Sequence, residues 1–170
     1  MCYIKHANHS PQFLTLYAGS DAYSSDGLPD NDQLGNYAIV PFWEDLYYYA
    51  SQNDGEGIFY QINEAQTTVN YTFILSASGS NYQLWEFGVF YDSTVPGVFT
   101  YVYQQIPDSG ASATVGVQGI DASNNAVGTT YSNSQTDITA GLTVVCDSNT
   151  GICSGSNGQT ATQGSDVPLG

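Results

Sequence analysis

The segment "VNYTFILSASGSNYQLWEFGVFYDSTVPGVFTYVYQQ", residues 69–105, contains three runs in which apolar side chains occupy every second position. A period of two is typical of β-strands that turn one face toward a core. The turn-forming stretches "SASGSN" and "DSTVPG" separate the runs, which favours antiparallel neighbours. We therefore expect three adjacent strands whose core residues include Phe73, Leu75, Phe87, Val89, Phe99 and Tyr101.

Short runs of the same kind lie on both sides of this segment, among them "YAIVPFW", "GIFYQI", "ATVGVQGI" and "LTVVC". No window shows the apolar stripe of a helix. The pattern predicts an all-β protein, an antiparallel β-sandwich of the jelly-roll or Greek-key kind, over residues 12–153. Residues 1–11 are left unassigned. Residues 154–170, rich in Ser, Gly and Thr, are expected to form a flexible C-terminal tail.

The charge balance excludes several classes of partner. The 170 residues include sixteen Asp and Glu, one Lys and no Arg, which gives a net charge of −15. Nucleic acids need Lys and Arg to neutralise phosphate, so we expect no nucleic-acid partner. No apolar stretch is long enough to insert into a membrane. Glycans, surface proteins, further copies of the chain and cations remain as partners.

Cysteines and sequons indicate an extracellular or cell-wall location. Cys146 and Cys153 enclose a short polar turn that would let a disulfide form in an oxidising compartment. Asn8 and Asn70 each begin an Asn-x-Ser/Thr acceptor for glycosylation. The first residues lack the apolar run of a secretory leader. We expect that the leader is missing from this chain or that the chain starts inside a longer product.

The stretch "NYAIVPFWEDLYYYAS", residues 36–51, concentrates aromatic and acidic side chains. Pro41 cannot donate to a sheet ladder, so it predicts a strand end, an edge or a bulge. Glu44 and Asp45 are adjacent and would point to opposite faces of an extended chain, so they cannot form a catalytic pair with each other. A glycosidase would need a second acid for either one. The candidates are Asp54, Glu56, Glu64, Glu86 and Asp92. The alternative is structural, with Trp43 in the core and Asp45 bonded to a turn.

Three consecutive tyrosines cannot all be buried on an extended chain, because neighbouring side chains emerge on opposite faces. At least one ring should therefore be exposed. Tyrosine stacks on sugar faces and supplies rigid contact area at protein interfaces. The turn "SQNDGEG" follows the tyrosines and carries two carboxylates. We predict a ligand-binding surface made of Tyr47, Tyr48, Tyr49, Asp54 and Glu56.

The strings "PFWEDL" (41–46), "GIFY" (57–60) and "ATVGVQ" (113–118) also carry a family resemblance. Residues 37–119 resemble the extracellular nidogen-like domain and its relatives, including versions in fungal surface proteins. The resemblance implies an adhesive or matrix role without catalysis. Relatives carry further strands before the position of Leu28-Pro29, so it also implies that the first strands of the domain are missing here.

Calcium is the one ion that the sequence leaves open, and otherwise we expect no cofactor. The loop "SDAYSSDGLPDNDQLGN" offers Asp26, Asp30 and Asp32, and calcium prefers such flexible carboxylates. A solvated acidic loop is the alternative. We expect no catalytic residues, since the two histidines lie before residue 10 and no base stands near a nucleophile. Three functions remain: a non-catalytic surface or matrix module for adhesion or assembly, a carbohydrate-binding sandwich, or a carboxylate-based glycoside hydrolase.

Overall fold

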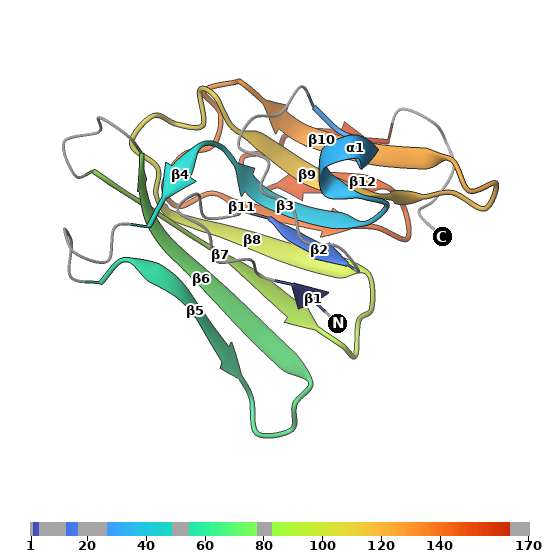
Figure 1. The fold of residues 1–170 in the computed structure, drawn as a ribbon, viewed down its shortest axis with the longest axis horizontal. Coiled ribbons are helices and arrows are strands. Elements are labelled where there is room, and N and C mark those ends of the chain that lie inside the picture. The colour runs from blue at the N-terminus through green and yellow to red at the C-terminus, as the bar shows by residue number, and fades with distance from the viewer. Residues whose placement is uncertain (1, 4–12, 17–26, 49–54, 78–82, 164–170) are drawn as a thin grey trace.

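A computed structural model describes residues 2–3, 13–16, 27–48, 55–77 and 83–163 of the chain. It confirms the all-β, antiparallel sandwich, because two antiparallel sheets pack against each other (Figure 1). No helix among these residues is long and apolar enough to cross a membrane.

The smaller sheet has five strands in the order β1-β2-β3-β9-β10. The larger has eight, in the order β13-β12-β11-β8-β7-β6-β4, with β5 also paired to β6. One short helix, α1, precedes β3. The bounds are β1 Cys2–Tyr3, β2 Leu14–Leu16, α1 Asn31–Leu34, β3 Ala38–Trp43, β4 Leu46–Tyr47, β5 Gly57–Ile62, β6 Thr68–Ala77, β7 Leu84–Asp92, β8 Val98–Gln105, β9 Thr114–Ile120, β10 Ala126–Asn133, β11 Thr143–Asp147, β12 Ile152–Gly155 and β13 Thr160–Thr162.

Strands β6, β7 and β8 are antiparallel neighbours, as the alternation in residues 69–105 predicts. Phe73 stands opposite Phe87 in the register, and their rings stack with centroids 5.0 Å apart. Five of the six predicted core residues are fully buried, and Phe99 is half-buried against the edge of the core. The alternating side chains of these strands therefore supply the larger sheet's half of the core.

Pro41 lies at a bulge in β3, which confirms the interruption that its missing N–H predicts. Val40 pairs with Gly116 and Trp43 with Thr114, so β3 carries one more residue than β9 between these pairs. Two tyrosines of β8 cross the core to this point. The hydroxyl of Tyr103 donates to the carbonyl oxygen of Pro41 at 2.6 Å, and that of Tyr101 to the carbonyl oxygen of Gly116 at 2.8 Å.

Both of these hydroxyls are completely buried. Burial raises the pKa of Tyr101 and of Tyr103 well above the ordinary value for tyrosine, since a phenolate would lose its hydration there. The hydroxyls therefore remain protonated donors. They satisfy carbonyl oxygens that lie at the irregular part of the β3–β9 ladder, and a buried carbonyl without a donor would destabilise the fold.

A second, smaller apolar cluster lies on the other face of the small sheet. Trp43 packs edge to face against Phe13 with ring centroids 5.5 Å apart, and Leu34 of α1 closes the cluster. The segment before α1 crosses β10 closely, since a Cβ on Gly128 would lie 2.8 Å from the backbone nitrogen of Pro29. Trp43 is thus buried, as the structural interpretation of residues 36–51 expects, in this cluster rather than between the sheets.

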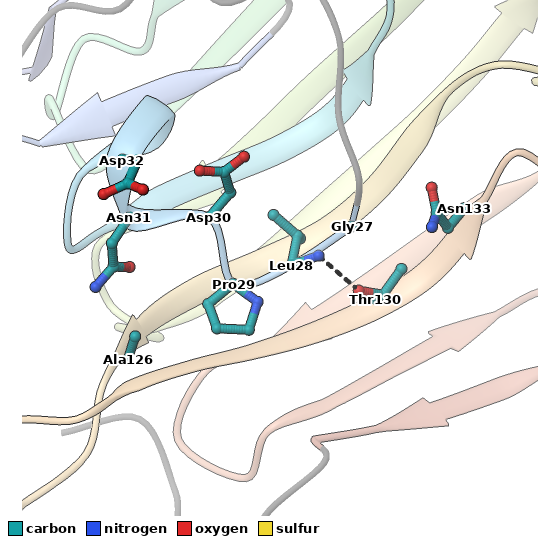
Figure 2. Close-up of a pocket in the computed structure, with 9 residues that line it drawn as sticks. All are labelled: Gly27, Leu28, Pro29, Asp30, Asn31, Asp32, Ala126, Thr130 and Asn133. Atoms are coloured by element: carbon teal, nitrogen blue, oxygen red, sulfur yellow. Dashed lines mark hydrogen bonds between the residues drawn. The ribbon is translucent and has the colours of Figure 1, made fainter.

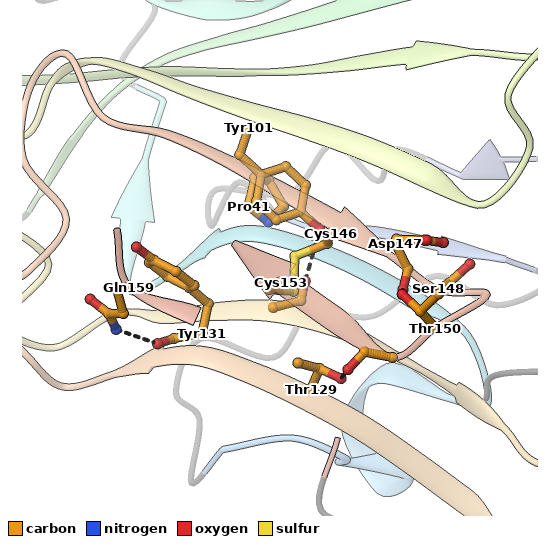
Figure 3. Close-up of a disulfide and its surroundings, with 12 residues drawn as sticks. Pro41, Tyr101, Thr129, Tyr131, Cys146, Asp147, Ser148, Thr150, Cys153 and Gln159 are labelled. Atoms are coloured by element: carbon orange, nitrogen blue, oxygen red, sulfur yellow. Dashed lines mark hydrogen bonds between the residues drawn. A yellow bond between two sulfur atoms is a disulfide. The ribbon is translucent and has the colours of Figure 1, made fainter. Parts of the chain in front are cut away.

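The predicted disulfide is present between Cys146 and Cys153, which stand opposite each other on β11 and β12. Figure 3 shows it beneath the ring of Tyr101 and above Thr129 of β10. Both cysteines are fully buried. The hydroxyl of Thr129 donates to the carbonyl oxygen of Gly151 at 2.9 Å, which ties the enclosed turn to the opposite sheet.

The domain boundary predicted at Cys153 is too early. β12 continues to Gly155, and β13 pairs with it. The amide of Gln159 donates to the carbonyl oxygen of Tyr131 at 3.0 Å, and the Tyr131 hydroxyl donates to Asn157 at 2.9 Å. Polar side chains rather than an apolar repeat anchor this segment, which is why hydropathy does not reveal it. Residues 164–170 of the predicted tail lie outside the described residues.

The Tyr103→Phe variant tests the bridge to the bulge. Removing the hydroxyl leaves the buried Pro41 carbonyl without its donor, so we expect the free energy of unfolding to fall by about 1–3 kcal/mol. Tyr91→Phe is the matched control, because Tyr91 is only half-buried and belongs to β7 of the same sheet. Denaturant unfolding of both variants measures the difference. Equal stability of the two variants would contradict the role given to Tyr103.

Replacing Cys146 and Cys153 together by serine tests the disulfide. The closed loop is short, with a sequence separation of 7 residues. Chain entropy alone then predicts a loss of about 2–3 kcal/mol in the free energy of unfolding. Chemical denaturation checks this, and the intact mass of the native protein should rise by the mass of two hydrogen atoms on reduction. A native protein that gains no mass under reductant would show that the bond does not form.

Candidate functional site

The tyrosine run is only partly on the surface. Tyr47 is half-buried in β4 and its hydroxyl donates to the Asp45 carboxylate at 3.0 Å, whereas Tyr48 is 43% exposed. This agrees with the expectation that at least one ring is exposed. Glu56 is only 6% exposed and accepts a hydrogen bond from the Ser76 hydroxyl at 2.9 Å. The prediction that Glu56 offers a surface carboxylate is therefore wrong. Tyr49 and Asp54 lie outside the described residues.

The predicted calcium loop contains a helix cap. The Asp30 carboxylate accepts hydrogen bonds from the backbone and side-chain nitrogens of Gln33, at 3.0 and 2.7 Å, and so caps α1. Asp32 is exposed in the first turn, and Asp26 lies outside the described residues. No group of three or more His, Cys, Asp or Glu in the described part of the chain is arranged to hold a metal ion. Local capping thus accounts for Asp30.

A hollow of about 550 Å³ is lined by this segment and by residues of β10. Figure 2 shows Asp30, Asn31 and Asp32 along one side of it and Thr130 and Asn133 along the other, with Leu28 and Pro29 between. Buried Gln118 fixes the segment from below. Its side-chain oxygen accepts from the Asp30 backbone N–H at 2.8 Å, and its amide donates to the Gly35 carbonyl oxygen at 2.5 Å. These two hydrogen bonds of Gln118 hold the segment that lines the hollow.

Glu44, from the stretch 36–51, meets an acid that lies far away in the sequence. It faces Asp108 of the β8–β9 loop and accepts a hydrogen bond from the Ser112 hydroxyl at 2.5 Å. Burial is the main cause that raises the pKa of Glu44 to about 7, and the charges of Asp108 and Asp45 raise it further. The second carboxyl oxygen of Glu44, Oε2, is buried without a hydrogen-bond partner. A proton on Oε2 would give it one, by donation to Asp108.

Asp108 is held by its own partners. One of its carboxylate oxygens accepts from the indole N–H of Trp85 at 3.0 Å and from the backbone N–H of Gly110 at 3.1 Å. Asp108 is near enough to raise the pKa of Glu44 through its charge and through a hydrogen bond, whereas glycosidases place their acids roughly 5–10 Å apart to leave room for the reacting atoms. The pair therefore suits a structural, proton-sharing role better than glycoside hydrolysis.

The core face of the larger sheet continues beyond the part that the smaller sheet covers. In the strand register, Ile62, Val69, Tyr91 and Phe99 form one row across β5 to β8, and Tyr60, Tyr71, Val89 and Tyr101 form the next. Figure 1 shows the β5–β6 hairpin extending away from the smaller sheet. We call the uncovered part the aromatic end; it comprises Tyr60, Ile62, Val69, Tyr71, Tyr91 and Phe99.

Exposure rises steadily toward β5. In the second row Tyr101 and Val89 are buried, Tyr71 is half-buried and Tyr60 is 70% exposed. In the first row Ile62 is 51% exposed. Rings pair along the surface, with Tyr91 stacked on Phe99 at a centroid distance of 5.3 Å. A soluble sheet normally turns such a face toward a core, so a continuous apolar surface at its end indicates a contact site.

A hollow of about 630 Å³ lies on the aromatic end beside the β5–β6 turn. Tyr71 and Tyr91 are among its lining residues, together with Ile62. Glu64 and Ser93, with neighbouring Asn, Gln and Thr side chains, supply hydrogen-bonding groups at its rim. Aromatic faces next to polar groups are the chemistry that holds a sugar ring or a tyrosine-rich protein surface.

The sequon at Asn70 lies on the opposite face of the same sheet. Asn70 is exposed in β6 and pairs in register with Phe90, so its side chain points away from the aromatic end. A glycan there would leave the aromatic end open. Asn8 lies outside the described residues.

Sequence reasoning missed both Asp108 and the aromatic end. Asp108 lies in the turn "PDSGAS", and only the folded chain brings it to Glu44. A local signal did exist for β5, because "GIFYQI" is apolar on both faces although strands of a covered sheet need only one apolar face. Such a strand in a sandwich must expose apolar side chains on at least one side.

No protein-family model matches the chain, and no curated protein or solved structure is detectably similar to it.

Glu44→Gln tests the carboxyl pair through the pH dependence of stability. The pKa of Glu44 is about 7 in the folded protein and 4.5 ordinarily, so the folded state binds the proton more tightly. Stability should therefore fall as the pH rises from about 4.5 to about 7, by about 1–2 kcal/mol once screening of this partly exposed group is allowed for. Glutamine keeps a donor toward Asp108 at every pH, so the variant should lose this fall.

Glu64→Gln, which removes one charge from the exposed β5–β6 turn, is the control and should keep the wild-type dependence. Thermal unfolding between pH 4 and pH 8 measures all three proteins. If the wild type and Glu44→Gln showed the same pH dependence of stability over this range, proton sharing with Asp108 would be contradicted.

Proposed function

We propose that this chain is a non-catalytic extracellular surface or matrix module that mediates adhesion or assembly through the aromatic end of its larger sheet. The observation that carries the proposal is the row Ile62, Val69, Tyr91 and Phe99, which continues the core face beyond the smaller sheet. Paired strands of the larger sheet carry these side chains. The surface is therefore preformed, and binding to it costs little conformational entropy.

Other features support an extracellular or cell-wall location. The Cys146–Cys153 disulfide is of the kind that persists in oxidising compartments. Exposed Asn70 could carry a glycan without covering the aromatic end. The resemblance of residues 37–119 to nidogen-like domains implies the same location and an adhesive role. The net charge of −15 disfavours nucleic acid and anionic membranes as partners.

Carbohydrate binding is the second candidate, and the hollow lined by Tyr71 and Tyr91 favours it. Tyrosine rings can stack on the apolar face of a sugar while the polar rim, including Glu64, accepts its hydroxyls. The acidic surface would repel anionic polysaccharides, so a neutral glycan suits the site best. Hydrolysis finds less support, because Glu44 is partly buried beside Asp108 and neither acid lines the hollows described above.

The double variant Tyr60→Ala/Ile62→Ala tests the proposal. Truncating the two most exposed side chains of the aromatic end should weaken retention on neutral cell-wall polysaccharide or on surface protein by about tenfold or more. The matched control is Phe59→Ala/Phe90→Ala, which truncates exposed rings on the opposite face of the same sheet.

Column retention of the variants and of the wild type measures the effect, and circular dichroism checks that each is folded. Loss of retention in the control alone, or release of sugar by the wild type, would overturn the assignment. Running the same variants on a protein matrix and on a polysaccharide matrix distinguishes the two candidate functions.

A further inference from the structure

Strand β5 is an edge strand of the larger sheet. Within the described residues it pairs with β6 on one side only, and Figure 1 shows it as the outermost strand there. Its pairing with β6 runs from Gly57 to Ile62 without a break in register. An unbroken edge strand presents a straight row of backbone donors and acceptors, which is a template for another strand.

The hairpin register shows which backbone groups face outward. Asn63 donates its backbone N–H to the carbonyl oxygen of Thr68, so this pair is hydrogen-bonded across the hairpin. Hydrogen-bonded and non-bonded pairs alternate along antiparallel strands. Gly57, Phe59 and Gln61 therefore bond to β6. The N–H and C=O groups of Ile58, Tyr60 and Ile62 point to the free edge, and no hydrogen bond joins them to another described residue.

Within Gly57–Ile62, this edge lacks the charged residue, the proline and the bulge that usually prevent edge-to-edge pairing. The six residues "GIFYQI" include no charge and no proline, and the strand has no bulge. Natural sheets protect their edges with lysine, proline, bulges or a covering segment. The free backbone groups of Ile58, Tyr60 and Ile62 also lie next to the aromatic end, so a strand added here would extend its apolar surface.

We propose that β5 pairs edge to edge with β5 of a second copy of this chain, in an antiparallel arrangement centred on Tyr60. This inference rests on the proposed function, since it identifies one partner in assembly through this end of the molecule. A two-fold axis at Tyr60 places Ile58 of each copy opposite Ile62 of the other. All three outward positions then form hydrogen-bonded pairs, because they occupy alternate sites along the strand.

The side chains of such a pair are self-complementary. Two tyrosines meet at the axis, and β-branched isoleucines meet on either side, on the same face as the aromatic end. Aromatic and β-branched cross-strand pairs are favourable in antiparallel sheets. The strand carries no charge, so no like charges oppose one another within it, although each copy has a net charge of −15. Association should therefore be weak at low salt and strengthen as salt screens the repulsion.

The test compares Tyr60→Pro with Tyr60→Ala in sedimentation or light scattering at increasing protein concentration and salt. Both variants lose the ring, but only proline removes the outward N–H, and it does so without breaking a bond to β6. We expect Tyr60→Ala to retain self-association and Tyr60→Pro to weaken it by a further tenfold or more. Ile62→Pro against Ile62→Ala repeats the comparison at a second outward position if the first proline variant unfolds.

Amide hydrogen exchange gives an independent measure. Concentrating the wild type should newly protect the amides of Ile58, Tyr60 and Ile62, whereas those of Phe59 and Gln61 should be protected already. Equal self-association of the proline and alanine variants, or no self-association of the wild type at any salt concentration, would overturn the strand pairing. Adhesion that survives Tyr60→Ala/Ile62→Ala would instead overturn the proposed function, so the two failures are distinguishable.

Discussion

The sandwich depends on the two tyrosine hydroxyls that reach from β8 across the core to the bulge in β3. Pro41 interrupts the β3–β9 ladder, and an interrupted ladder in a core leaves carbonyl oxygens without donors. Tyr103 and Tyr101 supply those donors to Pro41 and Gly116. The same contacts fix the position of one sheet over the other, because a hydroxyl can reach its acceptor only at one register. In each of these tyrosines the aromatic ring packs in the core and the hydroxyl supplies the hydrogen bond.

The position of the smaller sheet also determines which part of the larger sheet's core face extends beyond it. The smaller sheet lies over Tyr101, Val89 and Phe87, while β5 and the adjoining ends of β6 and β7 extend past it. Their core-facing side chains keep the alternation of a covered strand but meet solvent. The aromatic end is therefore a continuation of the core over which the described strands place no second layer. Its proposed role in adhesion or assembly follows from that position.

Two polar features are best explained by structure rather than by ligands. Asp30 caps α1, and Glu44 meets Asp108 in a contact that a shared proton would satisfy. Both acids drew attention in the sequence as potential metal ligands or catalysts. In the fold, Asp30 is engaged by Gln33, and Glu44 accepts from Ser112 while its second oxygen faces Asp108.

The sequence by itself predicted the all-β class, the antiparallel order of β6, β7 and β8, an interruption of the ladder at Pro41 and the disulfide between Cys146 and Cys153. These follow from local rules: a period of two, turn residues, a missing N–H, and two thiols separated by a short polar turn. Only the tertiary structure decided that Glu56 is buried, that residues 154–163 belong to the sheet and that Asp108 lies against Glu44. It also decided which part of the core face stays exposed. Each of these depends on contacts between residues far apart in the chain, and such contacts leave no periodic signal in the sequence.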